Sequence, residues 1–157
     1  MTPVTLANPP LHLVAAFNRH FPSVSAEWIV RAPGYEAWIA AVPARPDDYT
    51  YTLACADRPG RPVFTWHSAQ NKKTVLHRPL PDWSRYPAGV IVDLCAVGLN
   101  TPNIGAVVLG EETTSPRYEY GLGIATAALW HTIHDRPYTD DLLREIVDRV
   151  RREYLGH

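Results

Sequence analysis

The spacing of apolar residues changes half-way along the chain, and this change limits the folds that the chain can adopt. In the first half, apolar and polar residues alternate over short runs, most clearly at residues 49–56. Alternation with a period of two predicts half-buried strands. From Trp83 onward, apolar residues recur every three or four positions, which predicts helices. A run of strands followed by a run that is mostly helical is typical of an α+β fold.

The expected elements form one domain over residues 1–157, because no Gly/Ser linker, charge block or repeat divides the chain. We expect helices at residues 11–21, 83–99, 118–134 and 139–154. The last of these starts with the N-cap signal of Thr139 before Asp140 and Asp141. We expect strands at residues 25–32, 35–42, 49–56, 62–67 and 104–109, with an edge strand at 74–77. The predicted fold class is α+β, with a mixed or antiparallel sheet packed against helices.

Composition excludes several classes of partner. A formal net charge of −1 gives no electrostatic reason to expect nucleic acid or an anionic membrane. No apolar run approaches the roughly 20 residues that span a bilayer. Cys55 and Cys95 lie in apolar segments without metal-like spacing, which predicts buried thiols in a reducing compartment. We therefore expect a cytoplasmic protein with no nucleic-acid or membrane partner.

Residue patterns for catalysis or metal binding are weak. His131 and His134 have i, i+3 spacing, but a metal site needs a third ligand, and histidine is favoured at a helix C-terminus for electrostatic reasons. His67 has no nucleophile motif to act with. We assign no catalytic residue, no metal ligand and no cofactor. The arginines of the last helix are expected to form a solvated face: Arg144, Arg149, Arg151 and Arg152.

Several segments occur in the order of a known domain. Asp82-Trp83-Ser84-Arg85-Tyr86 leads into a helix with Gly89-Val90, and the strand at residues 104–109 follows. Upstream lies Arg31-Ala32-Pro33-Gly34. Over residues 28–156 this order resembles the N-terminal domain of galactokinases and other GHMP kinases. There, a D-W-x-x-Y-x-x-G-V helix precedes a strand, a glycine- and serine-rich phosphate loop and a helix. The resemblance implies the same α+β fold.

The segment at the position of the phosphate loop departs from the family pattern. Such a loop presents backbone N–H groups at a helix N-terminus, and glycine allows phosphate to approach. Residues 110–123 instead carry bulky tyrosines, three glutamates, and Pro116, which has no N–H. We expect that ATP does not bind here in the family manner. By position in the resemblance, Ser115 and Arg117 are the residues assigned to cofactor contact.

The segment that resembles the family's substrate region is also altered. In the family, R-A-P-G is followed by a second arginine for phosphoryl transfer and by acidic residues for the sugar. Here Tyr35 stands at the position of that arginine, and the family's G-E-H signature is absent. Asp48 and Tyr49 match the family's D-Y pair at a stretched spacing. The resemblance assigns them to substrate binding.

These departures lead to three hypotheses for function. The first is a stand-alone, catalytically inactive galactokinase-like domain that binds a sugar-like ligand or a protein partner. The second is half of a GHMP-type sugar kinase whose C-terminal part is separate or missing. The third is a structural or assembly protein. Because the family packs this domain against a second one, we also expect a homodimer or a protein partner, with interface residues from 28–38 or 49–53.

Overall fold

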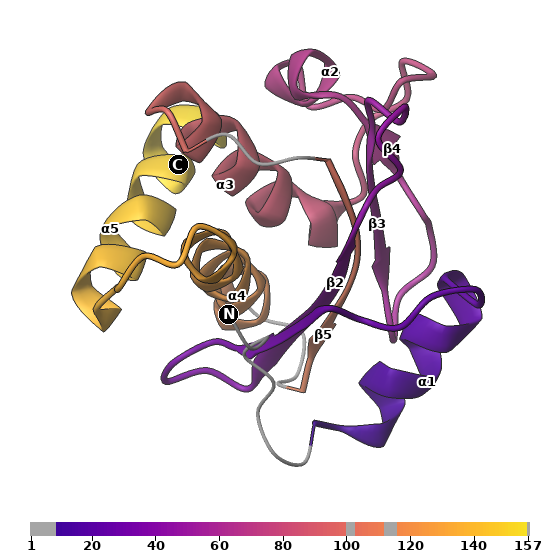
Figure 1. Cartoon of the computed structure of the whole chain (residues 1–157). Coiled ribbons are helices and arrows are strands. Elements are labelled where there is room, and N and C mark those ends of the chain that lie inside the picture. The colour runs from indigo at the N-terminus through magenta and orange to yellow at the C-terminus, as the bar shows by residue number, and fades with distance from the viewer. Residues whose placement is uncertain (1–8, 100–102, 112–115, 157) are drawn as a thin grey trace.

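A computed structural model describes residues 9–99, 103–111 and 116–156 of the chain (Figure 1). One helix comes first in this part of the chain, four strands follow, and helical elements predominate after them, including one short 3-10 helix (η1) and one turn with π-helical hydrogen bonding (η2). The helical elements are α1 (Leu11–His20), α2 (Trp66–Gln70), η1 (Asp82–Ser84), α3 (Arg85–Ala96), α4 (Pro116–Ile133), α5 (Asp140–Arg149) and η2 (Val150–Tyr154). The strands are β1 (Trp28–Arg31), β2 (Ala37–Pro43), β3 (Tyr51–Cys55), β4 (Val63–Phe64) and β5 (Ile104–Gly110).

The strands form one mixed sheet in the order β1-β2-β5-β3-β4. β1 and β2 form an antiparallel pair, and the chain reverses between them at Gly34, whose φ of +78° lies in the left-handed region that glycine favours. β5 lies at the centre, antiparallel to β2 and parallel to β3. All seven β5 residues are buried, as expected of an apolar strand with neighbours on both sides.

Helices cover both faces of the sheet (Figure 1). α1 packs on one face, where Leu13 and Phe17 join a cluster with Trp38 and Val107. α3, α4 and α5 cover the other face and enclose the larger core. Thirteen of the 18 residues of α4 are buried, so this helix is central, as its many apolar residues predict. The α+β class and the mixed sheet are therefore confirmed.

Two predicted strands differ from the structure. The strand expected at residues 62–67 ends after Phe64, because Thr65 caps a helix there: its hydroxyl accepts from the N–H of Ser68, and Ser68 Oγ accepts from the N–H of Thr65. No strand forms at 74–77. Those residues lie in a turn that the Thr74 N–H closes by donating to the Arg78 carbonyl over 2.8 Å. Local capping and turn bonds therefore outweigh the alternating pattern at both places.

The helices of the second half are close to their predicted limits. The helix expected at 83–99 begins with η1, continues as α3 and stops before Gly98, whose φ is +95°. Thr139 caps α5 as predicted, with its hydroxyl 3.1 Å from the N–H of Leu142. None of the helices in the described part of the chain is long and apolar enough to cross a membrane.

Candidate ligand site at the start of α4

The two residues assigned to substrate binding lie in the exposed connection between β2 and β3. The Asp48 carboxylate accepts from the Thr50 hydroxyl over 2.6 Å and from the Thr50 N–H over 2.9 Å. These hydrogen bonds, the hydroxyl's first, lower the pKa of Asp48. The side chain of Tyr49 is 80% exposed. Within the described structure this pair therefore forms a local turn.

Arg117, assigned to cofactor contact, lies in the first turn of α4. Its guanidinium donates to the Gly34 carbonyl over 2.8 Å and lies 4.4 Å from the centre of the Tyr35 ring. It therefore joins the start of α4 to the segment that resembles the family's R-A-P-G. Ser115, the other assigned residue, lies outside the described residues.

The structure does not bring the two assigned groups together. The register of β2 and β5 pairs Ala37 with Gly110 at one end of the sheet and Pro43 with Ile104 at the other. Arg117 follows the Gly110 end, whereas Asp48 follows the Pro43 end. One ligand of small size therefore cannot contact both.

A hollow of about 500 Å³ lies beside the start of α4. It is assembled from segments that are far apart in the sequence: the turn after α2, the η1–α3 junction, the first turns of α4, and η2 with the residue after it. Its lining residues are Lys72, Asp82, Arg85, Tyr86, Pro116, Glu119, Arg151 and Leu155. A neighbouring hollow of about 360 Å³ shares Tyr86, Pro116 and Arg151 and adds Tyr35, Arg117, Tyr120 and Asp148.

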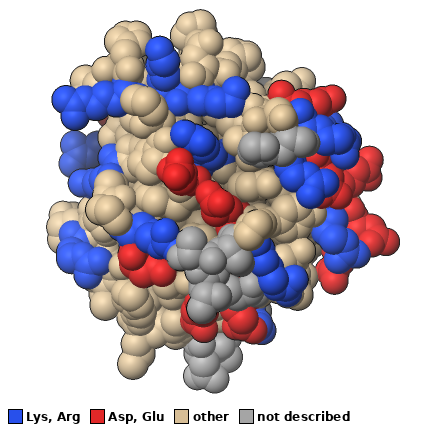
Figure 2. All heavy atoms as spheres, turned by 180° about the vertical axis from the view of Figure 1, so that it is seen from behind, with Lys and Arg blue, Asp and Glu red and all other residues tan. Residues whose placement is uncertain are grey.

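The charges around the first hollow are mixed in sign. Arg85 pairs with Asp82 at 3.4 Å, and Arg151 pairs with Asp148 at 3.6 Å. The Lys72 ammonium lies 5.0 Å from the centre of the Tyr154 ring. Figure 2 shows the same mixture on a larger scale, since basic and acidic side chains are interspersed over the face it presents. The hollow is therefore not a uniformly positive site.

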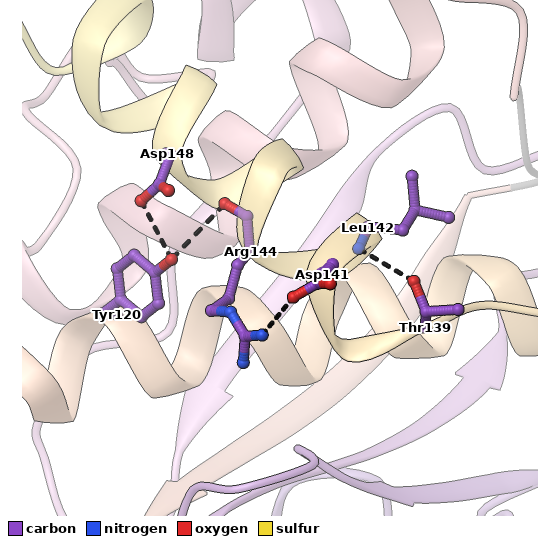
Figure 3. Close-up of polar contacts among 6 residues, drawn as sticks. All are labelled: Tyr120, Thr139, Asp141, Leu142, Arg144 and Asp148. Carbon is purple, nitrogen blue, oxygen red and sulfur yellow. Dashed lines mark hydrogen bonds and ion pairs between the residues drawn. The ribbon is translucent and has the colours of Figure 1, made fainter.

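Three tyrosines line the second hollow, and one of them, Tyr86, also lines the first. The Tyr120 ring lies 5.7 Å from that of Tyr35 and 6.0 Å from that of Tyr86, centre to centre. The Tyr120 hydroxyl donates to the Asp148 carboxylate of α5 over 2.9 Å (Figure 3). Burial, and then the bond to Asp148, raise the pKa of Tyr120; burial is also the main cause of the raised pKa of Tyr86. The Tyr120 and Tyr86 hydroxyls therefore stay protonated at neutral pH.

A small polar network lies beneath the first turn of α4. The Tyr118 hydroxyl donates to the Asp57 carboxylate over 3.0 Å and lies 3.4 Å from Cys55 Sγ. Burial, and then the nearby Asp57, raise the pKa of Cys55 to about 11, so the thiol is not an activated nucleophile. The Tyr118 ring also covers the end of β5: a Cβ added to Gly110 would stand 2.5 Å from it.

The histidine pair considered from the sequence, His131 and His134, lies at the end of α4. His131 is buried, and its Nδ1 lies 2.8 Å from the Ala127 carbonyl one turn earlier. Among the described residues, no three His, Cys, Asp or Glu side chains come together in a way that would hold a metal ion.

No pattern in the sequence predicts the hollow. Lys72, Arg85 and Arg151 belong to three separate segments, and only Arg85 lies within a motif, the one that begins at Asp82. They meet because η2 folds back on α2, where the Tyr154 hydroxyl donates to the Ala69 carbonyl. Only the tertiary structure shows this convergence.

No protein-family model matches the sequence, and no curated protein matches it. Three of the solved structures similar to it are kinases. The galactokinase of Lactococcus lactis, solved with galactose, aligns with a TM-score of 0.62 over 79% of this chain, at 18% identity. The mevalonate kinase of Methanococcus jannaschii aligns with a TM-score of 0.57 over 82% at 14% identity, and a second mevalonate kinase with 0.58 over 76% at 15%. The fold is similar to that of one part of these kinases.

The similarity to GHMP kinases covers only part of those proteins. The chain spans 31% of the galactokinase and 38% and 44% of the two mevalonate kinases. Because the identities are this low, the similarity concerns the fold alone. The fold resembles the N-terminal domain of a GHMP kinase, which agrees with the resemblance found in the sequence.

Proposed function

We propose that this chain is a binding domain with a GHMP-kinase N-terminal fold, and that it takes a small sugar-like ligand without transferring a phosphoryl group. The binding site in this proposal is the 500 Å³ hollow at the start of α4. Its volume falls within the range of about 300–1,000 Å³ that is usual for small-molecule sites. The observation that carries the proposal is that hydrogen-bond donors, acceptors and an aromatic ring line this one hollow.

The lining of the hollow supports a neutral, hydroxyl-rich ligand. Arg85 and Arg151 supply donors, Asp82 and Glu119 supply acceptors, and Tyr86 supplies an aromatic ring. Hydroxyl groups both donate and accept, so a polyol can use both kinds of side chain at once. The mixed charge leaves no strong preference for an anion.

The same residues do not fit a nucleoside triphosphate held in the manner that the resemblance implies. Pro116, the first residue of α4, has no N–H to offer. Tyr118 places its ring over the end of β5, where the family pattern has small residues. Glu119 and Asp82 bring negative charge to the hollow, which repels phosphate. We therefore derive no phosphoryl-transfer step for this chain.

A calorimetric titration with a panel of neutral monosaccharides tests the proposed site. We expect saturable binding of at least one sugar and a roughly tenfold rise in Kd in Glu119→Gln, because that substitution weakens a charged hydrogen bond without changing shape. Glu145→Gln, on exposed α5 surface, is the matched control and leaves Kd unchanged. Binding that is equal in all three proteins places the sugar elsewhere, and the absence of binding rejects the proposal.

A second candidate is half of a two-part GHMP-type kinase. The observation that favours it is the share of the neighbours' length that this chain covers, 31% of the galactokinase. Co-expression with a polypeptide that resembles the remaining part of such a kinase tests this candidate. Sugar-dependent ADP release by the mixture, but by neither part alone, would favour it over the first proposal.

A further inference from the structure

The charges of the chain are unevenly distributed along the sequence. From Arg58 to Pro81 there are three arginines, two lysines and no aspartate or glutamate, although the whole chain has a net charge of −1. Arg58 lies over the Tyr118 ring at 4.7 Å, and Arg61 over the Phe21 ring at 5.2 Å, so both guanidiniums lie against the body of the protein. The three remaining cations, Lys72, Lys73 and Arg78, lie in one small substructure.

That substructure is a hairpin formed by residues 72–80, which we call the basic hairpin. Leu80 N–H donates to the Lys72 carbonyl over 3.0 Å, and Lys73 forms an isolated β-bridge with Pro79. The Thr74–Arg78 bond closes the tip, and the Val75 N–H fastens the tip to the Val63 carbonyl of β4 over 2.9 Å. The hairpin lies beside α2 and the edge of the sheet (Figure 1). Its backbone is therefore fixed, and its side chains are displayed at a defined place.

The basic hairpin and the start of α2 display apolar side chains next to the cations. Leu76 is 72% exposed, Val75 38% and Trp66 40%. Of the other large apolar side chains exposed in the described structure, Leu11, Val24, Tyr49 and Val97 each come from a separate segment. Leu76, Val75 and Trp66, in contrast, all lie near β4. Trp66 is two residues after Phe64, and the Val75 N–H donates to the Val63 carbonyl. An apolar group with cations around it is the composition of a protein-binding surface.

The cations of this surface lack acidic partners of their own. In the described part of the chain, no carboxylate lies within ion-pair distance of Lys73 or Arg78. Asp82, the first acid after the hairpin, pairs with Arg85. The surface therefore presents positive charge that a negatively charged partner can neutralise.

The observations favour one class of partner. Valine and leucine do not stack on bases, and one partly buried tryptophan offers a single platform, so the surface is poorly suited to single-stranded nucleic acid. Val75 and Trp66 are only 38% and 40% exposed, so Leu76 is the one largely exposed apolar side chain of this surface, which is little apolar area to insert into a lipid bilayer. A second copy docked by its own basic hairpin across a two-fold axis would bring like charges together. We propose that the basic hairpin, with Trp66, docks an acidic segment of another protein that carries large apolar side chains.

The proposal is independent of the sugar site, because Lys73, Arg78 and Leu76 do not line that hollow. Fluorescence anisotropy of a labelled synthetic peptide that alternates glutamate with leucine tests it with the full chain. We expect saturable binding that weakens as salt rises and a roughly tenfold higher Kd in the double variant Lys73→Glu/Arg78→Glu. The control variant Arg136→Glu/Arg152→Glu carries the same change of charge at exposed positions elsewhere and is expected to bind the peptide with at most a small change in Kd.

A second variant separates the apolar contribution from the charge. Leu76→Ser leaves every cation in place and is expected to raise Kd several-fold, with the salt dependence unchanged. All of the substituted side chains are exposed, and far-ultraviolet circular dichroism checks that each variant is folded. Absence of peptide binding, or equal weakening in both charge variants, overturns the proposal. So does binding of phosphatidylserine vesicles or single-stranded DNA through Lys73 and Arg78 when the peptide does not bind.

Discussion

Tyr118 shows at the scale of one residue how this chain departs from the pattern that it resembles. In the sequence it is a bulky residue near the position of a glycine-rich loop. In the structure its ring closes the end of β5 and its hydroxyl bonds to Asp57 beside Cys55. Pro116 and Tyr118 were predicted from the sequence to oppose phosphate binding, but the network with Asp57 was not. Its members are 61 positions apart, and no local pattern links them.

Tyr118→Phe removes the hydroxyl and keeps the ring over Gly110. We expect the free energy of unfolding to fall by about 1 kcal/mol, because a partly buried hydrogen bond to the exposed Asp57 carboxylate is lost. Urea denaturation measures it. Tyr49→Phe, at a side chain that is 80% exposed, is the matched control and leaves stability unchanged. Equal stability of the two variants would mean that the Tyr118–Asp57 bond contributes nothing.

The Cys55 thiol provides a test that depends on pH. Burial raises its pKa from 9.0 to about 11, so the native state holds this proton more tightly than the unfolded chain does. The associated stabilisation is fully present below pH 9 and is lost as the pH rises through 11. At pH 8 we expect iodoacetamide to modify half-buried Cys95 well before Cys55, as read by peptide mass spectrometry. Faster modification of Cys55 in the folded protein would contradict the assignment.

At the scale of elements, the sequence predicts best where the spacing of apolar residues is long and regular. The limits of α4 and β5 were predicted within two residues, and the cap of α5 was predicted at Thr139. The prediction failed at residues 62–77, where β4 is only two residues long and a capped helix follows. Short alternation cannot distinguish a strand from a turn that is held by side-chain caps.

The N-cap of α5 can be removed by one substitution. Thr139→Ala deletes the oxygen that accepts from the Leu142 N–H, shown in Figure 3. We expect a loss of about 1 kcal/mol in the free energy of unfolding. Thr139→Ser keeps the acceptor and is expected to retain most of that stability. Thermal denaturation of both variants decides the matter, and equal losses would show that the hydroxyl is not the cause.

The contact between α3 and η2 depends on the absence of a side chain at Gly89. A Cβ there would stand 2.5 Å from Val150 and 2.7 Å from Tyr154. A glycine-to-alanine change inside a helix ordinarily stabilises it by up to about 1 kcal/mol. In Gly89→Ala we expect the opposite sign, a loss of about 1–3 kcal/mol from overpacking. A stabilised variant would mean that η2 does not pack against α3.

For the molecule as a whole, we expect the chain to form a homodimer in solution. Tyr51 and Leu53, two of the interface residues expected from the sequence, are buried in the core and cannot serve. The edge strand β1 and the exposed side chain of Tyr49 remain as candidate interface residues. Light scattering at micromolar concentration is expected to give twice the 17.6 kDa of one chain. A monodisperse mass of 17.6 kDa would reject the dimer.

A titration with magnesium-ATP is the sharpest test of the proposal that this chain has a fold like the N-terminal domain of GHMP kinases but does not transfer a phosphoryl group. Pro116, Tyr118 and Glu119 at the start of α4 are the residues from which we infer this. We expect no saturable heat with magnesium-ATP in the calorimeter and no sugar-dependent ADP release in a coupled assay of the same sample. Saturable binding at micromolar ATP together with ADP release that requires galactose would contradict the claim.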